Sequence, residues 1–244
     1  MGRAPALLDR RRSLALGAWL AAGAAWYFSA GSSSRLPLWW EVALLAFLLF
    51  PGVFLFDWIV LPLYRARGLL PVAGVLVALA VVAEAVDLEV AANAAKLAGV
   101  TFFAFWFLSL FEELVLLVVV SLIVPFVDAY SVFRGPTGHI VEHHSEVFTR
   151  FSVYWALPGV SEGPRLGIPD VLFFALYLAA AVRYGLRPGW TWLAMVAALG
   201  ATVAITVWAD VAGLPALPAL SFGFLIPNAD LIWRQLRVRH RDGP

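Results

Sequence analysis

Long apolar runs alternate along the chain with short clusters of charged residues, glycine and proline. Most runs approach the roughly 20 residues that a helix needs to cross the apolar core of a bilayer. The pattern predicts an all-α fold, a polytopic transmembrane helical bundle of about eight spans. The predicted spans are 13–31, 39–63, 69–86, 91–110, 111–133, 167–186, 189–210 and 215–233. Only Glu112 and Glu113 mark a turn between the fourth and fifth spans, so nine spans remain an alternative.

The composition supports a membrane protein. The chain is 62% hydrophobic and 14% charged, whereas a soluble domain is nearer half apolar and a quarter charged. It has too little polar surface to coat a globule, so we expect one membrane domain with no separate soluble domain. The net charge of +1 gives no sign of a nucleic-acid partner. The absence of cysteine excludes disulfides, thiolate nucleophiles and cysteine-based zinc sites.

Arginine clusters predict the orientation, because basic loops stay in the cytoplasm. The clusters lie at residues 10–12, 65–67, 183–187 and in the tail 234–244. The positions of these clusters agree with eight spans and with both termini in the cytoplasm. In this topology the polar loop 134–165 lies outside. The basic start also fits a signal peptide, but its long apolar stretch favours a retained first helix. A Gly-, Ala- and Arg-rich bias points to a prokaryotic cell membrane.

Three aspartates fall inside predicted spans, where a carboxylate is costly and marks a functional candidate. They are Asp57, Asp128 and Asp170. The last two each follow a proline, Pro125 and Pro169, which removes a backbone donor and disturbs the helix. In a membrane, freed backbone groups survive only where protein or a water-filled cavity satisfies them. We therefore expect Asp128 and Asp170 at irregular, wet positions.

Two facing aspartates have a recognisable chemistry. Placed close together they share a proton and titrate as a pair. One then accepts a proton from water while the other polarises a carbonyl, as in aspartic proteases. Spacing alone leaves two alternatives open. In the first, Asp128 and Asp170 are two separate structural residues. In the second, they form a proton or ion pathway together with Asp57, in a membrane transporter.

Three sequence signatures occur in an order that resembles a known family. The first is an aspartate late in an apolar helix, VDAYSVFRGPTG, with Asp128. The second is GIPD, with Gly167 and Asp170, in the place of a GxGD motif. The third is PAL at residues 215–217, within LPALPALSFGF. Over residues 111–233 the chain resembles the presenilin and signal peptide peptidase family of intramembrane aspartyl proteases.

The resemblance implies an endopeptidase that cuts peptide bonds within transmembrane segments. Asp128 and Asp170 would activate one water, with no metal or organic cofactor. The chain would divide into N-terminal helices over 1–110, a catalytic core over 111–233 and a basic tail. The residues expected to shape the site or bind substrate are Gly167, Ile168, Pro169, Pro215, Ala216 and Leu217.

The expected partners are a transmembrane-helix substrate and the lipid bilayer. A helical substrate hides its amides in i→i−4 hydrogen bonds, so it must unwind before attack. An extended substrate can be held as an added strand, and segments beside the Asp170 helix and the PAL motif would offer that backbone, as in the family. The basic tail favours the signal peptide peptidase orientation. Substrate identity and oligomeric state are not indicated.

The sequence departs from the family pattern at two positions. Val127 replaces the common tyrosine before the first aspartate, and Pro169 replaces the second glycine of GxGD. Proline fixes φ and removes an N–H, although helix starts tolerate it. A catalytically inactive, presenilin-like binding protein is therefore a further alternative.

Two other groups of residues attract weaker functional interpretations. His139, His143 and His144 in GHIVEHHSE make a metal site conceivable. We expect instead no metal and a solvated amphipathic helix at the membrane surface. For Asp57 we favour a polar contact between helices over a catalytic role.

Overall fold

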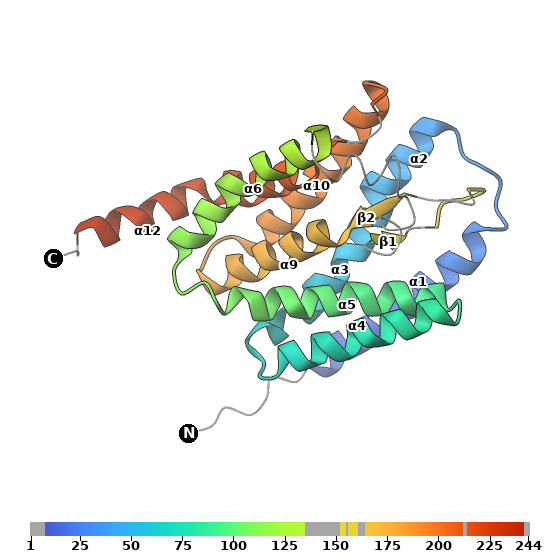
Figure 1. The fold of residues 1–244 in the computed structure, drawn as a ribbon, viewed down its shortest axis with the longest axis horizontal. Coiled ribbons are helices and arrows are strands. Elements are labelled where there is room, and N and C mark those ends of the chain that lie inside the picture. Colours follow the sequence, from blue (N-terminus) through green and yellow to red (C-terminus); the bar gives the residue numbers. More distant parts are fainter. Residues whose placement is uncertain (1–7, 135–151, 155, 161–163, 212–213, 242–244) are drawn as a thin grey trace.

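The protein is described here from a computed structural model, which places residues 8–134, 152–154, 156–160, 164–211 and 214–241. The fold is all-α, as predicted, with one small pair of strands (Figure 1). The N-terminal half contains α1 (Arg10–Ala30), α2 (Leu38–Leu44), the π-helical η1 (Leu45–Leu49), α3 (Phe50–Val60), η2 (Leu61–Arg65), α4 (Leu69–Ala85) and α5 (Glu89–Leu108). The C-terminal half contains α6 (Leu114–Arg134), β1 (Ser152–Tyr154), β2 (Arg165–Gly167), α9 (Ile168–Arg183), α10 (Pro188–Trp208), α11 (Leu217–Leu225), η3 (Ile226–Asn228) and α12 (Ala229–Arg241).

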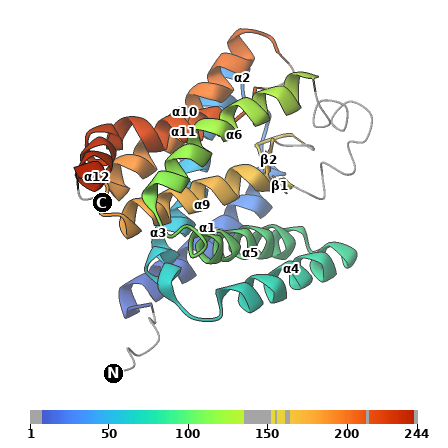
Figure 2. The ribbon, with the colours of Figure 1, turned by 60° about the vertical axis from the view of Figure 1, so that its left-hand side comes forward.

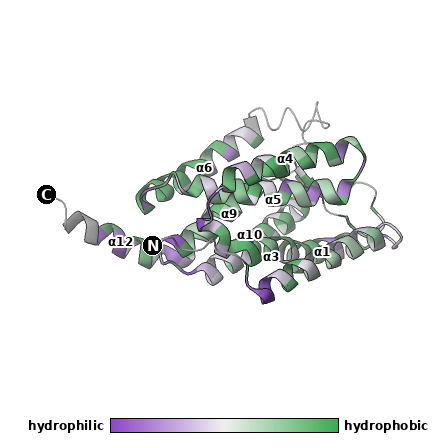
Figure 3. Cartoon of the chain, turned by 90° about the horizontal axis from the view of Figure 1, so that it is seen from below, coloured by the Kyte–Doolittle hydropathy of each residue, from purple (hydrophilic) through white to green (hydrophobic). Residues whose placement is uncertain are grey.

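Membrane character is supported by the lengths and apolarity of the helices. Among the described residues, four helical stretches are long and apolar enough to cross a bilayer: Leu38–Arg65, Glu89–Leu108, Leu114–Val132 and Pro188–Trp208. A shorter apolar helix covers Leu69–Ala85. Most residues along these helices are hydrophobic, as the colouring of the cartoon in Figure 3 shows. Eight crossings remain a prediction, although every predicted span contains helix.

The centre of the bundle is α9. Its residues from Phe174 to Ala181 are fully buried, as expected of a helix that is apolar on all sides. It packs against α3, α5, α10 and α11. Two ring stacks fix these neighbours: Phe54 of α3 lies on Phe174 at 3.7 Å between ring centroids, and Phe224 of α11 lies on Tyr177 at 4.8 Å. Any residue at the start of α9 is therefore held by a rigid helix.

The two short strands lie just before α9 in the chain and in space. β1 and β2 are antiparallel, with Ser152 opposite Gly167. Side chains of α5 hold the other side of β1: Lys96 Nζ donates to the Ser152 carbonyl at 3.3 Å, and the Tyr154 N–H donates to Asn93 Oδ1 at 3.0 Å. Lys96 also pairs with Glu84 of α4. These two strands were not predicted from the sequence.

Basic residues gather at one end of the bundle. The η2–α4 junction, the α5–α6 turn, the α9–α10 turn and α12 all lie at the left of Figure 1. Arg12, at the start of α1, donates to the carbonyls of Trp58 and Ile59 near the end of α3, both at 3.1 Å. Arg187 forms a bidentate pair with Asp230 at 2.6 and 2.8 Å. The four arginine clusters of the sequence thus share one end.

A buried asparagine joins the last helices to the α9–α10 turn. Asn228 is fully buried. Its Oδ1 accepts from the Arg187 N–H at 2.9 Å, and its Nδ2 donates to Thr191 Oγ1 and to the Phe224 carbonyl, both at 2.7 Å. The neighbouring Pro227 lies in the short 3-10 turn η3. The Asn228 side chain therefore supports the chain where the helix is interrupted.

We expect Asn228→Ala to lower the free energy of unfolding by about 1–3 kcal/mol, because it leaves buried donors and acceptors without partners. Thermal unfolding in a mild detergent measures the change. Gln235→Ala is the matched control: Gln235 is exposed and donates once, to the Tyr184 carbonyl, so its change should stay within about 0.5 kcal/mol. Equal losses in the two variants would contradict this account.

Candidate active site

Asp128 lies toward the C-terminal part of α6, one turn after Pro125. Its side chain is half-buried. Oδ2 accepts a hydrogen bond from the backbone N–H of Leu217, at 3.0 Å. Figure 2 shows α6 lying over α11, the helix that Leu217 begins. The structure thus brings the first predicted aspartate to the PAL segment.

The start of α11 explains why this amide is available. Leu217 is the first helical residue, and Ala216 before it provides no side-chain cap. The first amides of a helix have no partner within the helix. Pro215 and Pro218, on either side, have no N–H at all. Asp128 therefore supplies from another helix the acceptor that a capping residue normally supplies.

Asp170 stands in the first turn of α9. Gly167 ends β2 and is the N-cap residue, with φ −63° and ψ 146°. Ile168 and Pro169 follow at the first two helical positions, where a missing N–H costs no helical hydrogen bond. The Gly167 N–H donates to the Asp170 carboxylate. This contact is the returning half of a capping box, in which the third helical residue reaches back to the N-cap amide.

The predicted site residues come together at the starts of two helices. Asp128 lies close enough to Asp170 for their charges to act on each other. α11 packs against both α6 and α9. A Cβ added to Gly167 would stand 3.2 Å from Asp170 Oδ2, so the glycine permits a close approach of backbone and carboxylate. Two carboxylates, two helix N-termini and the end of β2 form one candidate site.

The remaining predicted residues adjoin Asp170 and Leu217 in the chain. Ile168 is half-buried, and Pro169 is exposed. Pro215 and Ala216 are half-buried in the segment that leads into α11. Neither proline disrupts a helix interior, because each stands at or before a helix start.

Asp57 lies elsewhere, in the core. It is fully buried, and its Oδ1 accepts from Thr101 Oγ1 of α5 at 2.6 Å. Its Oδ2 has no hydrogen-bond partner among the described residues. The contact agrees with the interpretation of Asp57 as a polar contact between helices. Thr101 was not predicted, and its only signal in the sequence is a hydroxyl within an apolar run.

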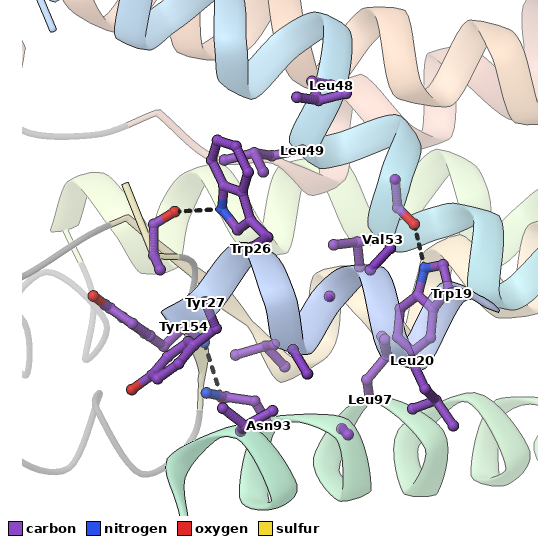
Figure 4. A pocket seen from close by; sticks show the side chains of 18 residues that line it. Trp19, Leu20, Trp26, Tyr27, Leu48, Leu49, Val53, Asn93, Leu97 and Tyr154 are labelled. Atoms are coloured by element: carbon purple, nitrogen blue, oxygen red, sulfur yellow. Dashed lines mark hydrogen bonds between the residues drawn. The ribbon is translucent and has the colours of Figure 1, made fainter. Parts of the chain in front are cut away.

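A separate apolar cavity of about 320 Å³ lies between α1, α3, α5 and β1 (Figure 4). Trp19 and Trp26 border it, and their indole N–H groups donate to the carbonyls of Gly52 at 2.5 Å and Ala156 at 2.9 Å. None of the predicted site residues lines this cavity.

No metal or cofactor site emerges from the part of the chain that the structure describes. Within it, no three His, Asp or Glu side chains come together in a way that could hold a metal ion. His139, His143 and His144 lie outside the described residues.

Comparison of the chain with protein-family models, with curated proteins and with solved structures gives no match.

The capping contact of Asp128 has a consequence for stability that is independent of chemistry. We expect Asp128→Ala to lower the free energy of unfolding by about 0.5–2 kcal/mol, the range for loss of an N-cap acceptor. Asp128→Asn keeps an oxygen that accepts from the Leu217 N–H, so it should lose clearly less. Thermal unfolding of both variants in detergent measures the difference. Equal stability of Asp128→Ala and the unchanged protein would show that the contact does not cap α11.

Proposed function

We propose that the protein is an intramembrane aspartyl protease that hydrolyses peptide bonds within transmembrane segments through Asp128 and Asp170. The observation that carries the proposal is that Leu217 of the PAL segment donates to Asp128 of α6, while Asp170 stands in the first turn of α9, within electrostatic range of Asp128. The three signatures of the resemblance lie far apart in sequence, yet they meet in one site. A common chemical task would account for this arrangement.

The proposed chemistry needs one water and one shared proton. The ionised carboxylate takes a proton from the water, and the water oxygen attacks the carbonyl carbon of the peptide bond. The protonated carboxylic acid hydrogen-bonds to the carbonyl oxygen and passes it its proton. The carboxylic acid formed in the first step then gives its proton to the amide nitrogen, while the other carboxylate takes a proton from a hydroxyl group of the resulting diol, so the C–N bond breaks and an amine leaves. The products are a carboxyl group and an amine, and the pair again holds one proton.

The Gly167 and Leu217 amides favour a fixed arrangement of the pair. Each donates to one of the two carboxylates. Each donor belongs to the backbone at a helix start, so it moves little while charge shifts during the reaction. Donors positioned in advance are an effective source of transition-state stabilisation.

The strand pair offers a place for unwound substrate. Asn93 and Lys96 occupy polar groups of β1 on the side away from β2. β2 ends at Gly167, and Asp170 follows within one helical turn. An extended substrate added along β2 would pass the Asp170 carboxylate, with main-chain hydrogen bonds providing affinity.

The gathering of arginines supports the proposed topology. All four basic clusters lie at the end of the bundle that contains the α9–α10 turn and α12. By the positive-inside rule that end would be cytoplasmic. Eight crossings with both termini inside would give the chain the signal peptide peptidase orientation, and the Gly-, Ala- and Arg-rich composition favours a prokaryotic cell membrane. Substrate spans would then be preferred with their N-termini inside.

Reporter fusions test this topology. We expect green fluorescent protein fused after Pro244 to fluoresce, and alkaline phosphatase at the same position to be inactive, because the tail is cytoplasmic. The same two reporters within the loop 134–165 serve as the control and should give the opposite result. An active phosphatase after Pro244 would overturn the orientation.

A cleavage assay tests the catalytic assignment. In liposomes with a labelled transmembrane peptide, we expect the unchanged protein to cut the peptide. Asp128→Asn and Asp170→Asn should each lower the rate by at least about 10²–10⁴-fold, because each removes an acid–base group. Asp57→Asn is the matched control: it changes a buried aspartate that contacts Thr101, and it should retain cleavage.

The other outcomes identify the alternatives. Equal cleavage by all variants would exclude the pair as the catalyst. No cleavage together with ion flux that depends on Asp57, Asp128 and Asp170 would indicate a transporter. Binding of the uncut peptide by a folded protein without ion flux would indicate an inactive relative, and Pro169→Gly would then test whether the proline is the cause.

A further inference from the structure

A second cavity lies at the basic end of the bundle, away from the candidate active site. Its volume is about 420 Å³, and it lies between the η2–α4 junction, the end of α5 and the end of α9. Its polar lining comes chiefly from Arg65, Arg183, Ser109 and Tyr64, and its apolar wall includes Phe105 and Leu108. Three helical segments thus meet around one hollow that has a charged and an apolar side.

The two arginines in this cavity have no carboxylate partner within the part of the chain that the structure describes. Among the described residues, neither Arg65 nor Arg183 forms an ion pair, whereas Arg187 at the same end pairs with Asp230. Glu112 and Glu113 follow α5 in the chain, but neither lines the cavity. The hollow therefore contains two cationic side chains without a facing anion.

Each guanidinium group has a contact within the described structure, although Arg65 is exposed. Arg183 Nη1 donates to the Leu108 carbonyl at 2.5 Å, at the end of α5. The Arg65 guanidinium lies over the Tyr64 ring, 5.0 Å from its centroid. A guanidinium has five N–H donors, so these contacts leave most of them available. Planar donor forks of this kind match the oxygens of a phosphate.

We propose that this cavity binds the phosphate of an anionic phospholipid. The arginines would bind the phosphate, and the wall of Phe105 and Leu108 would contact the upper acyl chain. Trp106 and Tyr64, also in the lining, are the residue types that gather at headgroup level. Basic pockets between transmembrane helices on the cytoplasmic side bind anionic headgroups. A free phosphate would use the arginines but gain nothing from the apolar wall.

The bound lipid would tie the ends of three segments together. η2 and α4 would be joined to α5 and α9 through a ligand that binds only the folded protein. Such binding raises stability in proportion to the logarithm of lipid concentration over Kd. The site does not involve Asp128 or Asp170, so a test of lipid binding does not depend on the proposed protease activity.

Thermal unfolding in a neutral detergent tests the site. We expect phosphatidylglycerol to raise the Tm of the unchanged protein, while phosphatidylcholine and inorganic phosphate leave it unchanged. Arg65→Gln should weaken phosphatidylglycerol binding about tenfold, the equivalent of one lost charge-assisted interaction. Adding Arg183→Gln should abolish the shift. Native mass spectrometry of the same samples counts the lipid molecules retained.

Arg67→Gln is the matched control, because Arg67 is an exposed arginine of the same junction that does not line the cavity. It should retain the full lipid effect. Arg65→Gln alone covers the case in which the double variant fails to fold, because no hydrogen bond of the Arg65 side chain is seen in the described structure. Equal lipid effects in Arg65→Gln and the unchanged protein would overturn the site. An equal shift with inorganic phosphate or phosphatidylcholine would overturn the assignment to an anionic lipid.

Discussion

A backbone N–H inside an apolar bundle has no water to bind, and this constraint organises the centre of the molecule. The start of α11 is the clearest case. Pro215 and Pro218 have no donor, and Ala216 provides no side-chain cap, so the Leu217 amide depends on Asp128 from α6. The carboxylate therefore cannot turn away without exposing an amide. A reactive group held in this way is preorganised by the same contact that begins the helix.

The same requirement applies to the other polar groups of the interior. Asp57 pairs with Thr101, Asn228 with Thr191, and Lys96 with the Ser152 carbonyl. Each contact joins elements that are distant in the sequence. Apolar surfaces alone give membrane helices little preference for one register over another, whereas hydrogen bonds between helices select one. These pairs thus fix the frame on which the two helix starts meet.

The helical segments could be predicted from the sequence because hydrophobic runs and their breaks are local signals. The predicted span 167–186, for instance, corresponds to α9 at Ile168–Arg183. The convergence of Asp128, Asp170 and the PAL segment was predicted from the resemblance, since no local pattern places residues so far apart beside one another. The number of crossings depends on the membrane itself, and four helices meet the length and apolarity required.

The strands and the arginine cavity could not be predicted, for a different reason. Each strand spans three residues, too few to show an alternating pattern. β1 is held by Asn93 and Lys96, whose positions in the sequence give no sign of a strand partner. Among the described residues, Arg65 and Arg183 have no ion-pair partner. This too is a property of the packed structure, because the sequence places Glu112 and Glu113 shortly after α5 and does not show whether they reach these arginines.

Pro169 is one of the two departures from the motifs of the resembling family, and its position limits what it can affect. It stands at the second helical residue of α9, where the lost N–H has no partner in a helix, so the fold loses nothing. Gly167, and not residue 169, is the position at which a Cβ would press on the Asp170 carboxylate. The proline ring is exposed, so under the proposed protease function it could contact a substrate strand added along β2. A glycine there would offer substrate an extra backbone donor and a closer path. The proline removes both, so its effect should fall on how the substrate backbone is held and not on how the aspartates are arranged.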